Sequence, residues 1–466
     1  MDRPFARKRT VSQIEVTSMN QIPHLGRSRI VKAITDANDS DKGFEQGTAM
    51  LDAVHFAVII DAEQAATPAG QSAVLTAVVT AVKCFGSATL VCGDDVALTR
   101  RFRLDRTLVE AARLHGAEIA QSIPKDATHV VAIGQADAEE VFVRCWWNGW
   151  MSGVLPAFDD EPIGNSDNPL AGIFAGALAV REVFAKALGR RRSIARRATI
   201  SLWNPWRLNG DQNPPTTLSL PDKLWFVGLG HLGQGFLWSL GFLPVAGCHA
   251  VLQDDQVVGK ENVATGLLTS SLDFETENHK TRVAARWLEA VGWKTSILER
   301  RNFGDLRLTS EDPVIMLMGL DEPAARIAIA KGCHDFVLDA GVGYGAIDFE
   351  IAQIRVIPRG VDPETLWSRP AAPKNVDAVL DKPAYREHAR KHGNCGTYSL
   401  AEASVAVPFV GAAIGALTIA QLLRLAALRP TNQISQVELG TVEAASAGVF
   451  NPVPGWGLGG FEFSFA

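Results

Sequence analysis

The 466-residue sequence has few cysteines, and none of them are arranged to hold a metal. The six cysteines are spread along the chain without a CxxC pair, which excludes a zinc framework of that kind and fits a reducing, cytoplasmic compartment. An excess of positive charge is also lacking, because the formal net charge is −6, and this argues against nucleic acid as the main partner. The basic N-terminus, MDRPFARKRT, is followed by no apolar stretch, so we expect no secretory signal.

One uncharged run, residues 405–423, is long enough to be weighed as a membrane span. It contains Pro408, Gly411, Gly415 and Gln421, and it lacks flanking Trp or Tyr anchors. Small residues of this kind suit close packing of a helix. We therefore expect a buried helix and no membrane partner.

A nucleotide-binding pattern is present near the middle of the chain. An apolar strand pattern, LWFVG, leads into the turn GLGHLG, in which Gly228 would make the tight turn and Gly230 would let the backbone approach a phosphate. Gly233 would let the following helix pack against the sheet. A second strand ends in Asp254 and Asp255, 21 positions beyond the turn, where a nucleotide-binding βαβ unit places a carboxylate on the ribose. We predict a nucleotide site here; the alternative is a βα turn without a ligand.

Two helices rich in small residues share one spacing pattern. The segment PLAGIFAGALAVREVF, from Pro169, and the segment PFVGAAIGALTIAQLL, from Pro408, agree at Pro, Gly, Gly, Ala and Leu with a constant offset of 239 residues. A period of that length indicates two related domains, each closed by a tightly packed helix, and not a solenoid. Chance agreement between two Ala/Gly-rich helices is the alternative.

The N-terminal half looks like the second domain with its nucleotide site lost. Apolar β-type runs alternate there with helical stretches, as in a parallel sheet, but the loop after the first run, DAEQAATPAG, has no GxGxxG. A chain of this length is expected to form two domains. The predicted division is an N-terminal segment 1–50, a degenerate Rossmann-like domain 51–189, a linker 190–222, an active domain 223–428 that includes a crossover loop 358–395, and a C-terminal extension 429–466.

The second domain resembles the adenylation domain of the ubiquitin-activating-enzyme superfamily, which includes the bacterial ThiF and MoeB proteins. The segments GLGHLG, LQDDQVV, ENVATG, ENHK and GLDEPAAR follow the order of that family's motifs. The resemblance implies an α/β fold with two Rossmann-like adenylation-type domains, the first degenerate and the second active. The resemblance also implies ATP and Mg²⁺ as cofactors. An alternative function, an NAD-dependent oxidoreductase, is supported only by the generic glycine-rich turn. In the implied site Asp254 and Asp255 hold the ribose, Asn262 and the catalytic Lys280 contact the phosphates, and Asp321 holds Mg²⁺.

Two departures from the family pattern bear on the phosphate site. His231 stands where the family's turn has its third glycine, and Thr265 with Gly266 stands where the family has Arg-Gln, which removes a phosphate-binding guanidinium. The family also has an arginine after the metal-binding aspartate, matched here by Arg326, and one that reaches across from the partner domain. The candidates that could supply the missing guanidinium are Arg282, Arg27 and Arg29, and the spacing singles out none of them.

Conjugating members of this superfamily use a cysteine to receive the activated protein, and the candidate here is Cys395. It lies in NCGTY, within a polar connection before the helix near Pro408, whereas the other cysteines lie in or near apolar runs or strands. The resemblance implies adenylation of a small ubiquitin-like protein with a C-terminal glycine, then thioester transfer to Cys395, with a conjugating-type enzyme as a further partner. The alternatives are adenylation alone, of a sulfur-carrier protein or a peptide, and a noncatalytic scaffold that binds nucleotide or a partner.

Overall fold

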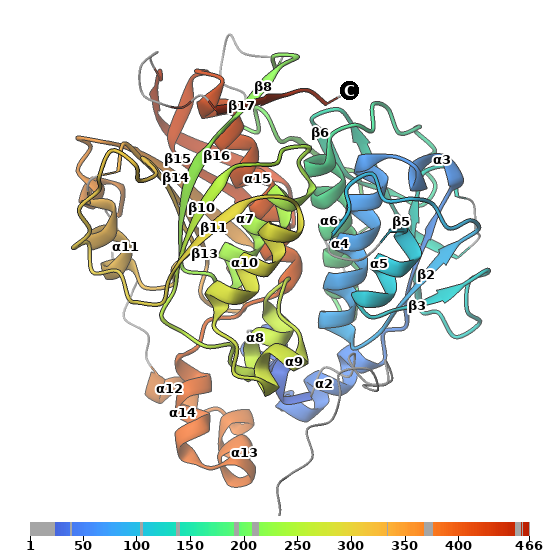
Figure 1. Ribbon diagram of the computed structural model, residues 1–466. Coiled ribbons are helices and arrows are strands. Elements are labelled where there is room, and N and C mark those ends of the chain that lie inside the picture. The colour runs from blue at the N-terminus through green and yellow to red at the C-terminus, as the bar shows by residue number, and fades with distance from the viewer. Residues whose placement is uncertain are drawn as a thin grey trace, which may run out of the picture.

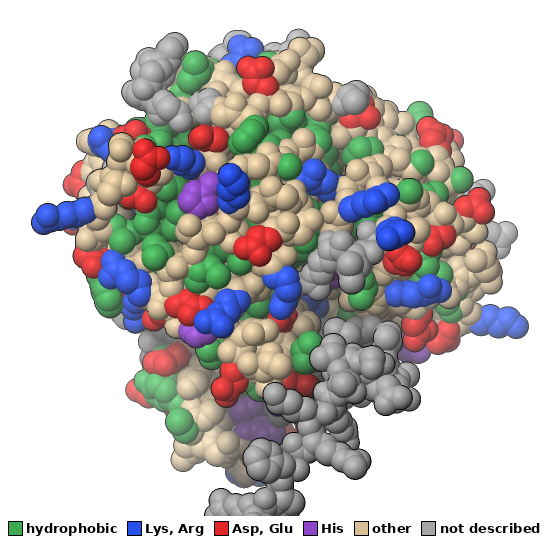
Figure 2. All heavy atoms as spheres, viewed as in Figure 1, with side chains coloured by type: hydrophobic (Ala, Val, Ile, Leu, Met, Phe, Trp, Pro, Cys, Tyr) green, Lys and Arg blue, Asp and Glu red, His purple; other side chains and the backbone are tan. Residues whose placement is uncertain are grey.

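The computed structural model shows two α/β domains packed side by side, with long helices between their sheets (Figure 1). Basic and acidic side chains are interspersed over the face seen in Figure 2. The structure describes residues 24–37, 40–102, 106–136, 140–190, 195–206, 214–332, 334–367, 376–452, 458 and 460–465.

The first domain is built on a seven-stranded sheet in the order β3-β2-β1-β4-β5-β6-β7. Its first five strands pair in parallel, and β6 and β7 add antiparallel pairs. The central strands are runs of buried Val and Ile, as expected where helices cover both faces of a parallel sheet. The strands are β1 (Phe56–Ile60), β2 (Ala88–Cys92), β3 (Ala117–Ala120), β4 (His129–Ile133), β5 (Val141–Asn148), β6 (Met151–Pro156) and β7 (Ala198–Ser201).

The second domain repeats this topology and adds one strand. Its eight-stranded sheet has the order β11-β10-β9-β12-β13-β14-β15-β16, parallel from β11 to β13 and antiparallel beyond. The same succession of crossovers in both sheets supports the two related domains predicted from the repeat. The strands are β9 (Lys223–Val227), β10 (His249–Gln253), β11 (Lys294–Leu298), β12 (Ile315–Met318), β13 (Phe336–Val342), β14 (Ile351–Pro358), β15 (Thr431–Glu438) and β16 (Glu443–Phe450).

In both domains helices connect successive strands of the sheet. In the first domain these are α3 (Ala62–Ala65), α4 (Pro68–Phe85), α5 (Leu108–Leu114) and α6 (Pro169–Ala187). In the second they are α7 (His231–Phe242), α8 (Lys260–Thr265), α9 (Ser271–Glu275), α10 (Lys280–Ala290), α11 (Pro323–Ala330) and α15 (Pro408–Ala426).

The two small-residue helices, α6 and α15, occupy equivalent places before the last shared strand of each sheet. A Cβ on Gly172 would lie 1.9 Å from the Ala69 carbonyl oxygen of α4, and a Cβ on Gly415 would lie 2.2 Å from the Gly235 carbonyl oxygen of α7. The repeated glycines therefore let α6 pack closely against α4 and α15 against α7, and α6 also packs against β5 and β6 of its sheet. Among the described residues α15 alone is long and apolar enough to cross a membrane, and its apolar window is 100% buried inside the protein.

Three segments lie outside the repeated units. Before the first domain come η2 (His24–Arg27), α1 (Ser28–Thr35) and α2 (Phe44–Asp52). Between β14 and α15 the chain forms η3 (Pro363–Trp367), which packs against α11, and then a small helical group that is set apart from the sheets in Figure 1: α12 (Val376–Leu380), α13 (Pro383–His392) and α14 (Asn394–Glu402). The short strands β8 (Leu218–Pro221) and β17 (Gly460–Phe463) pair with each other.

The structure assigns several of the predicted connecting segments to regular elements. The expected linker 190–222 includes β7, whose alternating buried residues pair with β6. The expected C-terminal extension 429–466 contributes β15 and β16 to the second sheet. The crossover 358–395, expected to be a loop, is largely helical where it is described. Gly393, at φ +82°, ends α13 and allows α14 to begin at the next residue, without a loop between the two helices.

Candidate active site

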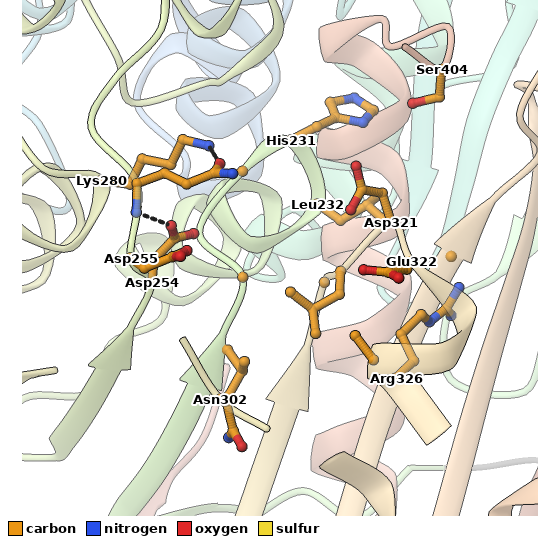
Figure 3. A pocket seen from close by; sticks show the side chains of 18 of the residues that line it. His231, Leu232, Asp254, Asp255, Lys280, Asn302, Asp321, Glu322, Arg326 and Ser404 are labelled. Atoms are coloured by element: carbon orange, nitrogen blue, oxygen red, sulfur yellow. Dashed lines mark hydrogen bonds between the residues drawn. The ribbon is translucent and has the colours of Figure 1, made fainter. Parts of the chain in front are cut away.

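A cavity of about 360 Å³ opens at the carboxyl ends of β9, β10 and β12. The strand order reverses between β9 and β12, which is where doubly wound sheets bind their ligands, and the volume lies in the range of small-molecule sites. Figure 3 shows Asp254, Asp255 and Lys280 on one side of the cavity and Asp321 and Arg326 on the other. The residues selected from the sequence that line it are Gly228, Gly230, Asp254, Asp255, Asn262, Lys280, Asp321 and Arg326.

The glycine turn has the geometry that its sequence predicts. Gly228 has a φ of +79°, and a Cβ there would lie 2.7 Å from Leu320. A Cβ on Gly233 would lie 2.1 Å from the Gly228 carbonyl oxygen, so this glycine allows α7 to pack against the turn and does not line the cavity. Gly230 precedes the first residue of α7 and has nothing within 4 Å of its Cβ position. Free N–H groups at the start of α7 therefore face the cavity, where an anion is stabilised.

His231 does not obstruct this turn, although it replaces a glycine of the family pattern. Its Nε2 lies 2.8 Å from the Val407 carbonyl oxygen and 3.1 Å from the Gly411 nitrogen, so the ring is fixed against the start of α15 (Figure 3). Burial lowers the pKa of His231 to about 4, so the ring is neutral at neutral pH.

The acidic pair divides into one engaged and one open carboxylate. Asp254 accepts hydrogen bonds from the Leu229 backbone nitrogen at 2.7 Å and from the Gln256 backbone nitrogen at 2.9 Å. It therefore ties the glycine turn to the end of β10. Asp255 is exposed at the same edge, and no hydrogen bond of its carboxylate is found among the described residues.

Lys280 and Asn262 enter the cavity from helix starts. Lys280 begins α10 and is 7% exposed; its Nζ donates to the neutral Gln256 Oε1 at 2.6 Å. Asn262 lies in the first turn of α8, where its Oδ1 accepts a hydrogen bond from the Gly259 nitrogen at 2.9 Å. Thr265, where the family has arginine, is buried and donates its hydroxyl to the Glu261 carbonyl oxygen.

Of the arginines considered from the sequence, Arg29 enters the cavity from α1. Its Nε donates to the Ser404 carbonyl oxygen at 2.9 Å and its Nη2 to the Ser404 hydroxyl at 2.6 Å. Burial lowers the pKa of Arg29, and the carboxylates of Asp321 and Glu261 oppose that shift. Arg27 is instead paired with Asp52, away from the cavity lining. Arg282 points outward and pairs with Glu299.

Asp321 is an exposed carboxylate at the end of β12. The residue that precedes α11 as its cap is Glu322, so Asp321 does not cap this helix. Arg326, the arginine that follows, is held by the buried carboxylate of Asp339, with 2.7 Å between Nε and Oδ1. Arg355 also donates to Asp339, at 3.2 Å.

Sequence reasoning missed two cavity arginines, Arg300 and Arg301. They follow β11, and the carboxyl end of that parallel strand lies at the same edge as the ends of β9 and β10, which was the available signal. Arg300 pairs with Asp305 and Arg301 pairs with Glu322. Their charges are thus already compensated on the surface.

Cys395 lies in the first turn of α14 and not in a loop, and its side chain is exposed. The other described cysteines are buried, and burial raises the pKa of the Cys84, Cys145 and Cys248 thiols, as expected for core residues. Cys333 lies outside the described residues. Ser404 and Val405, just beyond the other end of α14, line the cavity.

The first domain has a carboxylate at the position equivalent to the glycine turn. Asp61 follows β1 and accepts hydrogen bonds from the Gln64 nitrogen at 2.7 Å and the Gln135 nitrogen at 2.6 Å. A Cβ on Gly134 would lie 2.1 Å from the Asp61 carboxylate. Asp61 therefore ties the end of β1 to α3 and to the residue that follows Gly134.

Two family models match the chain: the BilD N-terminal domain over residues 55–202 and the BilD C-terminal domain over residues 220–428. The bacterial E1-like protein BilD of Collimonas sp. (strain OK412) is 32% identical over 322 residues, covering 67% of this chain and 69% of that protein. This chain belongs to the BilD family of bacterial E1-like proteins. The resemblance to the ubiquitin-activating-enzyme superfamily is confirmed at this level.

Among solved structures, this chain has a distant similarity to E. coli MccB. MccB with MccA-N7isoASN is 16% identical, with a TM-score of 0.35 over 50% of this chain and 66% of that chain. MccB with AMPCPP and selenomethionyl MccA is 17% identical, with a TM-score of 0.34 over 50% and 65%. The chain thus spans slightly less than two thirds of these MccB chains, and a likeness at this level carries no inference about ligands.

Proposed function

We propose that this protein activates a ubiquitin-like protein with ATP, by adenylating its C-terminal carboxylate and then transferring the acyl group to Cys395. The observation that carries the first step is the charge arrangement of the cavity. Arg29 and Lys280 both line it, and among the described residues neither forms an ion pair with a carboxylate. Two cations without an ion-pair partner among the described residues, beside a helix N-terminus, suit a polyphosphate.

In the adenylation step, an oxygen of the substrate carboxylate attacks the α-phosphorus of ATP as the bond to pyrophosphate breaks. Negative charge then grows on the nonbridging oxygens and on the departing pyrophosphate. Lys280 and Arg29 neutralise this charge and so lower the barrier. Arg29 takes the place of the guanidinium that is absent at Thr265, and Asn262 supplies a further polar contact to the phosphates.

The remaining polar groups fix the nucleotide. Asp255 binds the ribose, while Asp254 holds the glycine turn that presents backbone N–H groups to the phosphates. Asp321 is the residue suited to Mg²⁺. No cluster of three His, Cys, Asp or Glu side chains exists among the described residues. The ion would therefore complete its shell with phosphate oxygens and water, as Mg²⁺ usually does, and would supply charge neutralisation.

The transfer step is proposed on the placement of Cys395. As a thiolate it attacks the acyl carbon, a C–S bond forms, the acyl C–O bond breaks and AMP leaves. Cys395 is the second residue of α14, and its side chain is exposed, so the sulfur is open to a reaction partner. Cys395 lies seven residues before Glu402, the last residue of α14, which is about 10 Å at 1.5 Å per residue, so transfer requires the helical group to approach the adenylate.

Pyrophosphate exchange into ATP, dependent on a small protein with a free C-terminal carboxylate, tests the first step. Lys280→Ala should lower the exchange rate by at least about 10²-fold, because one partner of the transition-state charge is removed. Arg282→Ala is the matched control. Arg282 is also on α10, but its side chain points outward and pairs with Glu299, so this substitution should leave the rate of pyrophosphate exchange unchanged. Equal rates in wild type and Lys280→Ala would refute the assignment, and no exchange with any such protein would favour a noncatalytic scaffold.

Thermal-shift titration addresses the cofactor separately. ATP with Mg²⁺ should raise the melting temperature, and the shift should be lost in Asp254→Ala, because the glycine turn is tied to β10 through that carboxylate. A larger shift with NAD than with ATP would contradict the proposal.

A further inference from the structure

Lys83 belongs to the first domain, but its amino group is buried against the second. It lies near the end of α4, and the residue is 6% exposed. Its Nζ donates to the Val263 carbonyl oxygen at 2.6 Å and to the Thr269 carbonyl oxygen at 2.8 Å. Within the part of the chain that the structure describes, it forms no ion pair with a carboxylate, although the negative charge of Asp273 acts on it and partly opposes the lowering of its pKa by burial.

One of the two carbonyl groups belongs to the helix that carries a cavity residue, and the other belongs to the turn that follows this helix. Val263 follows Asn262 in α8, and Thr269 lies in the turn beyond the helix. The Thr269 hydroxyl donates to the Asn262 carbonyl oxygen at 2.5 Å, and the Gly266 nitrogen donates to the same oxygen at 2.8 Å. A continuous set of hydrogen bonds therefore runs from Lys83 to the backbone of Asn262.

Burial of this amino group has a cost that domain packing alone does not explain. Taking an ammonium out of water is unfavourable unless polar groups surround it, and burial lowers the pKa of Lys83 to about 7. Most of the other buried side chains of α4 are small or apolar, and these pack without that cost. A cation near the last carbonyl groups of α8 is favoured by the helix dipole, so its orientation is tied to that helix.

We propose that Lys83 is a positioning residue of the ATP site: from the first domain it fixes the end of α8 and the turn beyond, and so holds Asn262 in the cavity. This rests on the proposed adenylation for its functional consequence. The structural part, that Lys83 holds α8, is independent of any reaction. The first domain, which has no glycine turn of its own, thereby completes the site of the second.

A second cross-domain cation provides a matched control. Arg100 of the first domain donates to the Val291 carbonyl oxygen at 2.8 Å and to the Val245 carbonyl oxygen, both in the second domain. The Arg100 Nε also donates to the Gly241 carbonyl oxygen near the end of α7, at 3.4 Å. None of these acceptors belongs to α8 or to the cavity lining. Replacement of Arg100 therefore removes interdomain hydrogen bonds of the same kind without touching the path to Asn262.

The experiment compares Lys83→Met with Arg100→Met in the full chain. Hydrogen exchange of residues 260–269 should accelerate about tenfold or more in Lys83→Met and stay near wild type in Arg100→Met, because a charge-assisted hydrogen bond to that segment is lost. In pyrophosphate exchange, the KM for ATP should rise about tenfold in Lys83→Met, with kcat changed much less. The double variant Lys83→Met/Asn262→Ala should have the same KM for ATP as Asn262→Ala alone, because both substitutions act through Asn262.

Several outcomes would overturn the proposal. The first is an equal rate of hydrogen exchange of residues 260–269 in Lys83→Met and Arg100→Met. The second is an unchanged KM for ATP in Lys83→Met. The third is an additive effect of Lys83→Met and Asn262→Ala on the KM for ATP. If Lys83→Met does not fold, Thr269→Val breaks the same path at the Asn262 carbonyl without unpairing a buried amine, and it should raise the KM in the same direction. If wild type itself shows no pyrophosphate exchange, the adenylation proposal fails, while the hydrogen-exchange comparison still decides whether Lys83 holds α8.

Discussion

Removal of Arg29 is the sharpest perturbation of the proposed site, because this side chain reaches the cavity from the segment that precedes the first domain. Arg29→Ala should lower the rate of pyrophosphate exchange by about 10²- to 10³-fold, the scale seen when one preorganised donor to transition-state charge is lost. Two hydrogen bonds to Ser404 are lost with it, at 2.9 and 2.6 Å, so part of the effect is structural. Each such bond contributes about 1 kcal/mol, or roughly fivefold.

Two further variants separate these contributions. Ser404→Ala removes the hydroxyl partner and leaves the guanidinium, so its loss of exchange should stay below about tenfold. Arg29→Lys keeps a positive charge without the planar fork and should fall between wild type and Arg29→Ala. Circular dichroism and thermal melting should show all three variants folded. Equal losses in Ser404→Ala and Arg29→Ala would refute a direct role of Arg29 at the phosphates.

Three more predictions follow from other parts of the structure. Cys395→Ala should keep pyrophosphate exchange but lose any thiol-reducible adduct with the small protein on a nonreducing gel; an adduct that survives moves the role to another cysteine. Asp339→Ala leaves the arginines at 326 and 355 as unpaired buried charges and should lower the free energy of unfolding by about 3–5 kcal/mol in urea, and a loss below 1 kcal/mol would contradict a paired charge. The free energy of unfolding of wild type, relative to that of Lys83→Met, should increase by up to about 1.4 kcal/mol for each pH unit between about pH 7 and 10. In that window the folded protein binds fewer protons than the unfolded chain, since burial lowers the pKa of Lys83 to about 7; a decline with pH would reverse the assigned cause.

The residues that could be found from the sequence are those fixed by local geometry. Gly228, Gly230 and Asp254 follow directly from the turn between a strand and a helix and from the length of one βαβ unit. The repeat that relates α6 to α15 was visible because close helix contact requires glycine at fixed spacing. Gly172 and Gly415 both meet backbone oxygens at distances that no side chain would allow.

The residues that could not be found depend on contacts between distant parts of the chain. Arg29 was one of three candidates, and only its hydrogen bonds to Ser404, 375 positions away, place it in the cavity. The polar sequence around Cys395 suggested a loop, but Gly393, at φ +82°, lets α14 begin at the next residue. Cys395 therefore lies in the first turn of α14, whereas it is the other end of this helix that is near the cavity. Lys83 gave no signal, since its acceptors are main-chain oxygens, which carry no sequence identity.

The presence of a first domain without its own glycine turn has a physical rationale in these contacts. Of the two cavity cations without a carboxylate partner, Arg29 comes from a segment before the first domain, and the helix that bears Asn262 is fixed by Lys83 of that domain. If two separate chains had to supply these groups, the site would form only at concentrations above their dissociation constant. In one chain the second contribution is intramolecular, with a high effective concentration. The site at the β9–β12 switch point can then stay complete in a single molecule, while in the first sheet Asp61 occupies the turn that is equivalent to the glycine turn.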